Sequence, residues 1–287
     1  MFLGDYRIEI IPDTEFRLDG GAMFGVVPRV LWERVCPPDE LNRVRLNMNC
    51  LFVETPTEKI LIETGIGEKW SEKETRMYGI FREKPFAKSL FEITGYQPED
   101  ITIVVNTHLH FDHAGGNTTG GRASRLPETN SAVPQFPNAR YFVSKSEFEH
   151  AENPHERDRA SYLPENWQSL QESGQLELKP DTYEVVDGLR MEQIPGHSRT
   201  MQTVRLDRGG HTLYGFADLI PTRHHLSLPW IMGYDLFPTE TLEFKKRILP
   251  QAALENWTCL FYHDFEMPLC EIEYAGGKII AKACAAS

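Results

Sequence analysis

Residues 108–113 read His108-Leu109-His110-Phe111-Asp112-His113, which places four side chains that can bind metal within six positions. The preceding residues 101–105 (Ile-Thr-Ile-Val-Val) are all β-branched and predict a buried strand, while residues 114–116 (Ala-Gly-Gly) permit a tight turn into a helix. Open α/β sheets place ligand sites at the carboxyl ends of their strands, because loops there can direct several side chains to one point. The hexapeptide therefore predicts a functional site.

The spacing within the hexapeptide indicates two metal ions. In an extended chain, alternate residues point to the same side, so His108 and His110 can reach one ion. Asp112 and His113 follow where the chain is expected to turn, and they would suit a second ion. Imidazole and carboxylate donors without a thiolate favour zinc, with manganese, cobalt or iron as alternatives. Any one of these histidines alone would more simply be a hydrogen-bonded or surface residue, so the prediction depends on the four together.

The pattern His-x-His-x-Asp-His resembles the signature of the metallo-β-lactamase superfamily, whose fold is an α/β, four-layered αβ/βα sandwich. Three further parts of the family pattern follow in the expected order: His197 after Pro-Gly, Asp218 at the end of the apolar run 213–218, and His263 at the end of the run 258–263. Alone, each histidine could be a turn or strand-end residue, and Asp218 could cap a loop. The series spans most of the chain and implies the sandwich fold.

The resemblance implies two Zn²⁺ ions per chain, or manganese, cobalt or iron in their place. It assigns seven ligands to them: His108, His110 and His197 to the first ion, Asp112, His113 and His263 to the second, and Asp218 to both. Two cations held close together predict hydrolysis, because a water shared between them loses a proton near neutral pH, while one ion polarises a carbonyl or phosphoryl oxygen. Asp112 is the catalytic candidate that passes this proton to the leaving oxygen, with ligation alone as its other role.

One segment of the sequence resembles a particular branch of the superfamily. Residues 19–25 (Asp-Gly-Gly-Ala-Met-Phe-Gly) are similar to the quorum-quenching N-acyl homoserine lactonases, in which such residues lie beside the acyl chain. The resemblance implies that Met23 and Phe24 contact substrate. Residues 19–28, whose glycines permit movement and whose Met23 and Phe24 supply apolar contact, are also a candidate lid, with core packing as the alternative. Those lactonases often carry a tyrosine shortly after the bridging aspartate. Here Leu-Ile-Pro-Thr follows Asp218, so Thr222, His224 or a tyrosine from elsewhere would have to serve.

The expected activity is hydrolysis of N-acyl homoserine lactones or similar cyclic esters. Phosphotriesterase, thioesterase of the glyoxalase II kind and β-lactam cleavage remain alternatives on the same centre. A di-iron oxidoreductase is disfavoured by His110, because that branch tends to place glutamate there. A non-catalytic protein stapled by its metals is disfavoured by the ligand set, since structural zinc sites are usually closed by four ligands.

Glu63, in Ile62-Glu63-Thr64-Gly65, stands where the family usually has an aspartate. It could hold the ligand loops by hydrogen bonds, as the outer partners of metal ligands do. The alternative is an ordinary solvated or salt-bridged glutamate, and Glu63 is left out of the expected site.

Composition bounds the partners and the location. The chain has 287 residues and a formal net charge of -12, which opposes binding to nucleic acid, so a small-molecule substrate is expected. No run approaches the roughly twenty apolar residues that cross a bilayer, and the amino terminus is too polar for a signal peptide. The five cysteines lack metal or disulfide spacing. We expect a single domain over residues 1–287, cytoplasmic and without membrane contact, with a homodimer possible.

The pattern of apolar residues predicts alternating strands and helices. Strands are expected at 6–11, 47–62, 101–106, 140–143, 203–206, 211–216 and 258–262, and helices near 144–151, 164–173 and 239–254. Residues 116–138, rich in Gly, Thr, Ser, Pro and Asn, predict a long loop. Such a loop could be a lid over the substrate, a dimer contact or a surface insertion.

Overall fold

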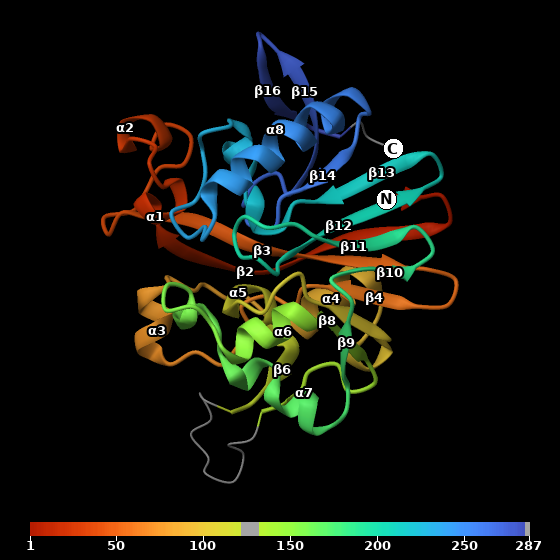
Figure 1. Cartoon of the computed structure of the whole chain (residues 1–287). Coiled ribbons are helices and arrows are strands. Elements are labelled where there is room, and N and C mark those ends of the chain that lie inside the picture. Colours follow the sequence, from red (N-terminus) through yellow and green to blue (C-terminus); the bar gives the residue numbers. More distant parts are fainter. Residues whose placement is uncertain (122–131, 285–287) are drawn as a thin grey trace. The chain divides into compact units, whose positions relative to one another are not determined.

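The computed structural model describes residues 1–121 and 132–284, drawn in colour in Figure 1. The chain divides into two compact units: unit 1 comprises Met1–Glu15 and Met48–Asp181, and unit 2 comprises Phe16–Asn47 and Thr182–Ser287. One domain over residues 1–287 stays a prediction. Within the described residues, no helix is both long and apolar enough to cross a membrane.

The first sheet has seven strands and belongs to unit 1, apart from the parts of β2 and β3 that lie in residues 16–47. Strands β4, β5, β8 and β9, which form one side of the sheet, are parallel, whereas β3 and β4 form an antiparallel hairpin. The strands, in sheet order, are β1 (Phe2–Leu3), β2 (Tyr6–Asp19), β3 (Arg43–Glu54), β4 (Lys59–Ile62), β5 (Ile103–Val105), β8 (Arg140–Ser144) and β9 (Leu176–Lys179).

The expected strands of unit 1 are present, with corrected bounds. The strand predicted at 6–11 continues to residue 19, and the run 47–62 is two strands joined by a turn rather than one. At that turn, the Thr55 hydroxyl accepts hydrogen bonds from the backbone amides of residues 57 and 58. Threonine offers this local alternative to the strand ladder, and the sequence reasoning did not weigh it.

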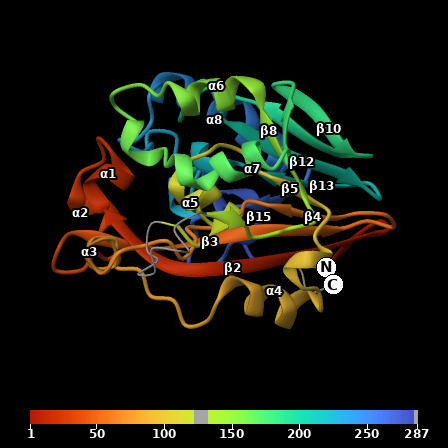
Figure 2. The ribbon, with the colours of Figure 1, turned by 90° about the horizontal axis from the view of Figure 1, so that it is seen from below.

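The helices of unit 1 are short. Figure 2 shows α4 beside β2, where the Arg7 guanidinium donates to the carbonyls of Ile93 and Thr94 at the end of the helix. Gly95 then ends α4 in the left-handed conformation that favours glycine. The α-helices are α3 (Glu72–Met77), α4 (Phe86–Thr94), α5 (Phe111–Ala114), α6 (Lys145–Glu152) and α7 (Gln168–Glu172), and the 3₁₀ helices are η1 (Pro98–Asp100), η2 (Gly115–Asn117), η4 (Arg159–Ser161) and η5 (Pro164–Asn166).

The predicted helices near 144–151 and 164–173 correspond to α6 and to η5 followed by α7. α6 begins directly after β8, because the Ser144 hydroxyl accepts the backbone N–H of Glu147. The long loop predicted at 116–138 includes a short antiparallel pair, β6 (Thr118–Thr119) and β7 (Val133–Pro134). Residues 122–131 of that loop, and the question of a lid there, lie outside the described residues.

Unit 2 contains the second seven-stranded sheet, which is antiparallel except for the parallel pair β13 and β14. Its strands, in order, are β10 (Thr182–Val186), β11 (Leu189–Gln193), β12 (Gln202–Arg208), β13 (His211–Gly215), β14 (Thr258–Leu260), β15 (Leu269–Ala275) and β16 (Lys278–Lys282). The predicted strands at 203–206, 211–216 and 258–262 are confirmed as β12, β13 and β14. The sequence reasoning missed β10, β11, β15 and β16, in which most residues are exposed or only partly buried.

Helix α8 (Pro238–Leu254) confirms the prediction at 239–254 and packs its apolar face into the core of unit 2. That core is made of buried residues of the sheet and the helix, among them Tyr214, Phe216, Phe244, Leu249, Trp257 and Ile272. Unit 2 also holds α1 (Gly20–Phe24) and α2 (Arg29–Trp32), and the 3₁₀ helices η6 (Ala217–Leu219) and η7 (Arg223–Leu226). The candidate lid at residues 19–28 contains the helical turn α1, which is capped by the Asp19 carboxylate accepting the Ala22 N–H at 2.9 Å.

Candidate metal centre

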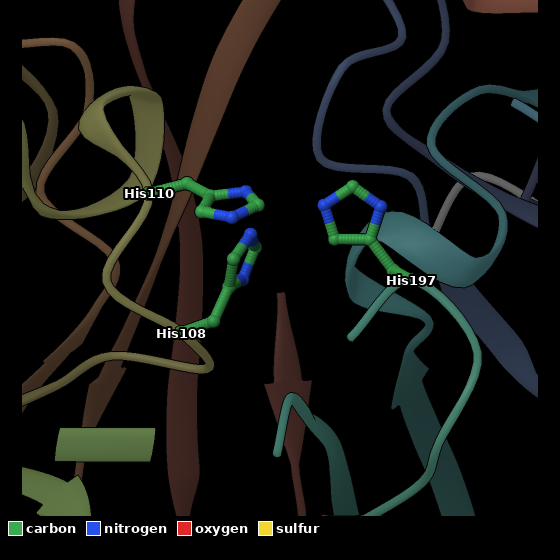
Figure 3. A group of neighbouring side chains, drawn as sticks. All are labelled: His108, His110 and His197. Atoms are coloured by element: carbon green, nitrogen blue, oxygen red, sulfur yellow. The ribbon is translucent and has the colours of Figure 1, made fainter. Parts of the chain in front are cut away.

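Four of the expected ligands lie together in unit 1, between β5 and the end of α5. His108 and His110 follow β5, with the backbone extended at His110, and Figure 3 shows their imidazoles side by side. Their ring centroids are 4.5 Å apart, and those of His108 and His113 are 4.0 Å apart. Asp112 and His113 lie within α5, so the chain does turn there as predicted, although the helix begins ahead of the Ala-Gly-Gly run rather than after it. All four side chains are buried.

A buried carboxylate fixes the backbone between the first two histidines. Glu147 Oε1 accepts the backbone N–H of Leu109 at 2.8 Å and the Tyr162 hydroxyl at 3.1 Å. The Tyr162 ring in turn packs edge-on against His110, with ring centroids 4.7 Å apart. A buried amide without an acceptor would cost about 1–3 kcal/mol, so this contact holds the segment in one conformation. The sequence reasoning missed Glu147, which lies 38 residues away on the buried face of α6.

Glu63 is buried, which rules out the solvated reading of this residue. Its carboxylate accepts hydrogen bonds from the backbone N–H and hydroxyl of Thr107 and from the side-chain amide of Asn106. Glu63 Oε1 also lies 3.2 Å from Nδ1 of His113. Ligand atoms of Glu63, His108 and His113 fall within 4.8 Å of one another, so this group alone could hold an ion. Glu63 thus lies close enough to orient His113 or to ligate with it.

The turn after α5 depends on close backbone approach. Gly116 donates its N–H to the Gly65 carbonyl, and a Cβ at Gly116 would lie 2.1 Å from the Thr64 carbonyl oxygen. Lys69 extends beneath this turn and donates from Nζ to the Gly115 carbonyl and to both oxygens of Thr118. Burial lowers the pKa of Lys69 to about 7. These contacts explain why small residues follow the metal motif.

The other three expected ligands lie together in unit 2. His197, the third residue labelled in Figure 3, follows β11; Asp218 lies in η6 after β13, and His263 follows β14. Nε2 of His197 is 3.5 Å from Oδ2 of Asp218, and Nε2 of His263 is 3.1 Å from Oδ1 of Asp218. One carboxylate therefore has a histidine nitrogen at each of its two oxygens. All three side chains are buried.

The opposite nitrogen of each of these histidines faces a protein acceptor. His197 Nδ1 lies 3.0 Å from Oδ1 of Asp235, whose other oxygen accepts the Thr241 hydroxyl at 2.7 Å. His263 Nδ1 lies 3.1 Å from the carbonyl oxygen of Asn47. A carbonyl can only accept, so Nδ1 of His263 carries the proton. The sequence reasoning missed these partners, because each is far from its histidine along the chain and in no recognisable motif.

The tautomer of His263 indicates whether the histidine and carboxylate donors of unit 2 fit a metal ion. A neutral imidazole protonated at Nδ1 carries a lone pair at Nε2, and in His263 that lone pair would face the Asp218 carboxylate. Two acceptors at this distance repel each other unless a positive charge, either a proton or a metal ion, is present at Nε2. Metal-bound histidines typically donate their other N–H to a carboxylate or backbone carbonyl. The donor set of unit 2 therefore fits a divalent cation.

Backbone strain occurs at both groups of ligands. Among the described residues, four other than glycine have positive φ: Asn42, Glu63, Ala217 and Asn256. Asparagine tolerates this conformation, but Glu63 at φ 65° and Ala217 at φ 48° do not adopt it readily. Glu63 lies beside His113, and Ala217 immediately precedes Asp218. Strained backbone conformations of this kind are typical of functional sites, where the surrounding structure holds a side chain in one orientation.

A cavity of about 260 Å³ in unit 2 reaches one of the expected ligands. Its lining includes His263 together with Thr222, His224, Arg45 and Arg223. Both candidates for the missing tyrosine's role are therefore in one cavity with a candidate ligand. The Thr222 hydroxyl, however, is already within 2.8 Å of His225 Nδ1, and burial lowers the pKa of His224. The cavity favours His224 over Thr222 as a group that could meet substrate.

Met23 and Phe24 are buried in unit 2, each with only 1% of its surface exposed. The Phe24 ring stacks on Trp32 and on His225, with centroids 5.2 Å and 4.8 Å apart. The Met23 carbonyl lies 2.9 Å from Nε2 of His225. These contacts match the core-packing alternative, and contact with substrate stays a prediction for both residues.

Comparisons with known proteins agree with this geometry. Residues 44–263 match the metallo-β-lactamase superfamily. An N-acyl homoserine lactonase of Bacillus cereus is 28% identical over 246 residues, covering 78% of this chain and 84% of the relative. A crystal structure of a probable metal-dependent hydrolase from Staphylococcus aureus is 29% identical, with a TM-score of 0.88 and complete coverage of both chains.

A second solved structure supports the fold alone. It is the dizinc quorum-quenching lactonase AidC in complex with a product, at 20% identity and a TM-score of 0.79, covering 100% of this chain and 97% of that one. The predicted α/β sandwich of the metallo-β-lactamase fold is confirmed by these neighbours. The chain therefore belongs to the metallo-β-lactamase superfamily, as a metal-dependent hydrolase related to N-acyl homoserine lactonases.

Proposed function

We propose that this protein is a binuclear metal-dependent hydrolase that opens the ring of N-acyl homoserine lactones or similar cyclic esters. Two findings support the proposal. Relatives that cover three quarters of the chain are named N-acyl homoserine lactonases, and both units carry buried groups of histidine and carboxylate donors. The expected partner is thus a small molecule, in keeping with the acidic net charge of -12.

We assign the ligands as the family resemblance implies. His108, His110 and His197 would hold one ion, Asp112, His113 and His263 the other, and Asp218 would serve both. Zinc suits this set of imidazoles and carboxylates, with manganese, cobalt or iron as alternatives. When bound, two such ions lower the pKa of water and polarise a carbonyl oxygen.

The arrangement of His197, Asp218 and His263 is the single observation that carries the proposal. The two histidines face different oxygens of one carboxylate, at 3.5 and 3.1 Å, and each has its other ring nitrogen beside a protein acceptor. A structural histidine–aspartate pair needs only one such contact. A carboxylate that binds two cations would use both of its oxygens. The position of one histidine beside each oxygen of Asp218 therefore favours a site for two cations.

The remaining steps belong to side chains of the chain itself. Asp112 lies in the first turn of α5 and is 6% exposed, so its carboxylate is shielded from bulk solvent. We assign it the transfer of a proton from the attacking water to the oxygen that leaves the ring. His224, in the cavity that reaches His263, would meet the substrate in place of the tyrosine found in related lactonases.

The proposal is tested by a substrate panel on protein of known metal content. The panel contains acyl-homoserine lactones of several chain lengths, a simple γ-lactone, an aryl ester, a phosphotriester, S-lactoylglutathione and a chromogenic cephalosporin. Lactone opening is followed by the proton it releases. His110→Ala should abolish turnover, and His155→Ala is the matched control because that histidine is exposed on the surface of unit 1.

The outcomes separate the substrate from the chemistry. Turnover of lactones that disappears in His110→Ala and persists in His155→Ala supports the proposal. Metal-loaded protein that leaves every lactone intact but cleaves the triester or thioester would overturn the substrate assignment. Metal-loaded protein that cleaves none of the panel would overturn hydrolysis of these ester classes by this centre.

A further inference from the structure

Unit 2 contains a second and larger cavity that none of the seven expected ligands lines. Its volume is about 610 Å³, within the roughly 300–1,000 Å³ that is usual for small-molecule sites. It lies among three elements: the residues from η7 to Trp230, helix α8, and the hairpin of β15 and β16. Figure 1 shows α8 and this hairpin in unit 2. We call it the α8 cavity.

The walls of the α8 cavity are mostly apolar. They include Leu226, Leu228 and Trp230 on one side, with Pro250 of α8 and Ile279 of β16 on the others. Trp230 is held edge-on against Phe24, with ring centroids 5.6 Å apart. Leu228 is 38% exposed, so the apolar wall is open to an incoming ligand. A ligand with an apolar body would bury surface here that water now covers.

The charged groups of the α8 cavity are all basic. Lys245 and Lys246 come from α8, and Lys278 comes from the start of β16. Among the described residues that line the cavity, none is acidic, although the chain as a whole has 42 acidic and 30 basic residues. The cavity is therefore basic although the chain as a whole is acidic, which indicates a ligand that carries negative charge.

Lys245 adds a buried positive charge beneath the cavity. Its side chain is fully buried, and Nζ donates to the carbonyls of Ser227, Leu228 and Trp230 at 2.6, 3.2 and 2.8 Å. These acceptors satisfy the ammonium without a carboxylate in contact. Because burial disfavours the charged form, the pKa of Lys245 falls to about 7. An anion bound nearby would relieve this cost.

We propose that the α8 cavity binds a medium-chain acyl carboxylate, with the acyl chain along the apolar wall and the carboxylate at the exposed lysines. Lys246 shares its charge with Glu243 of the same helix at 2.6 Å, so Lys278 at the hairpin end is the principal contact for the carboxylate. This site goes beyond the proposed hydrolase activity and does not require it, because neither its lining nor its ligand involves the expected metal ligands.

The test is calorimetric titration of decanoate into the full-length protein. Decanol, which has the chain without the charge, and acetate, which has the charge without the chain, are the ligand controls. Lys278→Glu reverses one exposed charge at the cavity, and Lys73→Glu makes the same change of net charge on the exposed surface of α3 in unit 1. We expect Lys278→Glu to weaken decanoate binding by about tenfold and Lys73→Glu to leave it within about twofold.

Metal-stripped protein distinguishes this site from the candidate metal centre, since a carboxylate could also bind a metal ion. The proposal requires decanoate to bind the stripped protein with an unchanged Kd and to bind much more tightly than decanol or acetate. Three results would each overturn it: decanoate binding that is lost with the metal, equal affinity for decanol, or equal loss in the two lysine variants. Hydrolase turnover is measured separately, so its failure would not affect this outcome.

Discussion

Replacing Asp235 should weaken metal binding, although we do not assign it as a ligand. Its carboxylate is buried, with Oδ1 3.0 Å from Nδ1 of His197 and Oδ2 accepting the Thr241 hydroxyl at 2.7 Å. The contact holds the imidazole in the tautomer and orientation that present Nε2 to a cation. Removing such an outer partner typically costs 10–100-fold in metal affinity, or about 1.4–2.8 kcal/mol.

Two substitutions separate the charge from the hydrogen bond. Asp235→Asn keeps an acceptor oxygen near Nδ1 but loses the negative charge, so we expect the loss to be about tenfold. Asp235→Ala leaves the buried N–H without its acceptor, and we expect about 100-fold. Thr241→Val removes only the outermost hydrogen bond of the series, and its effect should be smaller than that of either aspartate variant.

The assay is competition with a chromogenic zinc chelator, together with the metal content of each purified variant. Asp207→Asn is the matched control, since Asp207 is also a hydrogen-bonded aspartate of unit 2 but contacts Arg205 and Thr212 rather than an expected ligand. Circular dichroism establishes that each variant is folded. Wild-type zinc affinity in folded Asp235→Ala would refute the reasoning.

Three more outcomes follow from the structure. His110→Ala should reduce the bound metal by about one equivalent and lower kcat/KM for lactones by at least about 100-fold, as measured by metal analysis and initial rates. Glu147→Ala leaves the buried Leu109 amide without its acceptor and should destabilise the fold by about 1–3 kcal/mol in urea unfolding, with wild-type stability as the contrary result. Burial lowers the pKa of Lys245 to about 7 in the folded protein, so between pH 7 and the unfolded pKa of 10.5 the unfolded chain binds more protons than the folded one. Over this range the free energy of unfolding of the wild type should rise with pH relative to that of Lys245→Met, by up to about 1.4 kcal/mol per pH unit. A difference between the two proteins that does not change with pH would contradict the lowered pKa.

The sequence predicted the fold class and the elements around residues 108–113 more completely than it predicted the other strands and helices. The strand before His108 and the turn at Asp112 each depend on a few consecutive residues, so the periodicity and composition of the sequence could locate them. The antiparallel strands β15 and β16 were missed because few of their side chains are buried: β15 buries only Cys270 and Ile272, and β16 alternates between exposed and intermediate residues, which gives little contrast in hydropathy. Helices α3 and α4 were missed because each is short and bounded by loops.

Contacts between distant residues could not be predicted from one sequence. Asp235 meets His197 across 38 residues, and the carbonyl of Asn47 meets His263 across 216. A backbone carbonyl leaves no signature in the side-chain sequence at all. Glu63 differs from these partners, because the sequence pattern did point to its position. The sequence could not show, however, that this glutamate is completely buried and accepts hydrogen bonds from Thr107.

His225 shows why burial alone does not identify a metal ligand. Like His263, it is a buried histidine of unit 2, and burial lowers its pKa to about 3, so it is neutral. Its Nε2 lies 2.9 Å from the Met23 carbonyl and must donate, while its Nδ1 accepts from the Thr222 hydroxyl at 2.8 Å. A single neutral tautomer satisfies both contacts without any added charge. For His263, a carbonyl at Nδ1 and a carboxylate at Nε2 leave two acceptors for the one proton of a neutral imidazole, so Nε2 needs either a second proton or a metal ion, which His225 does not.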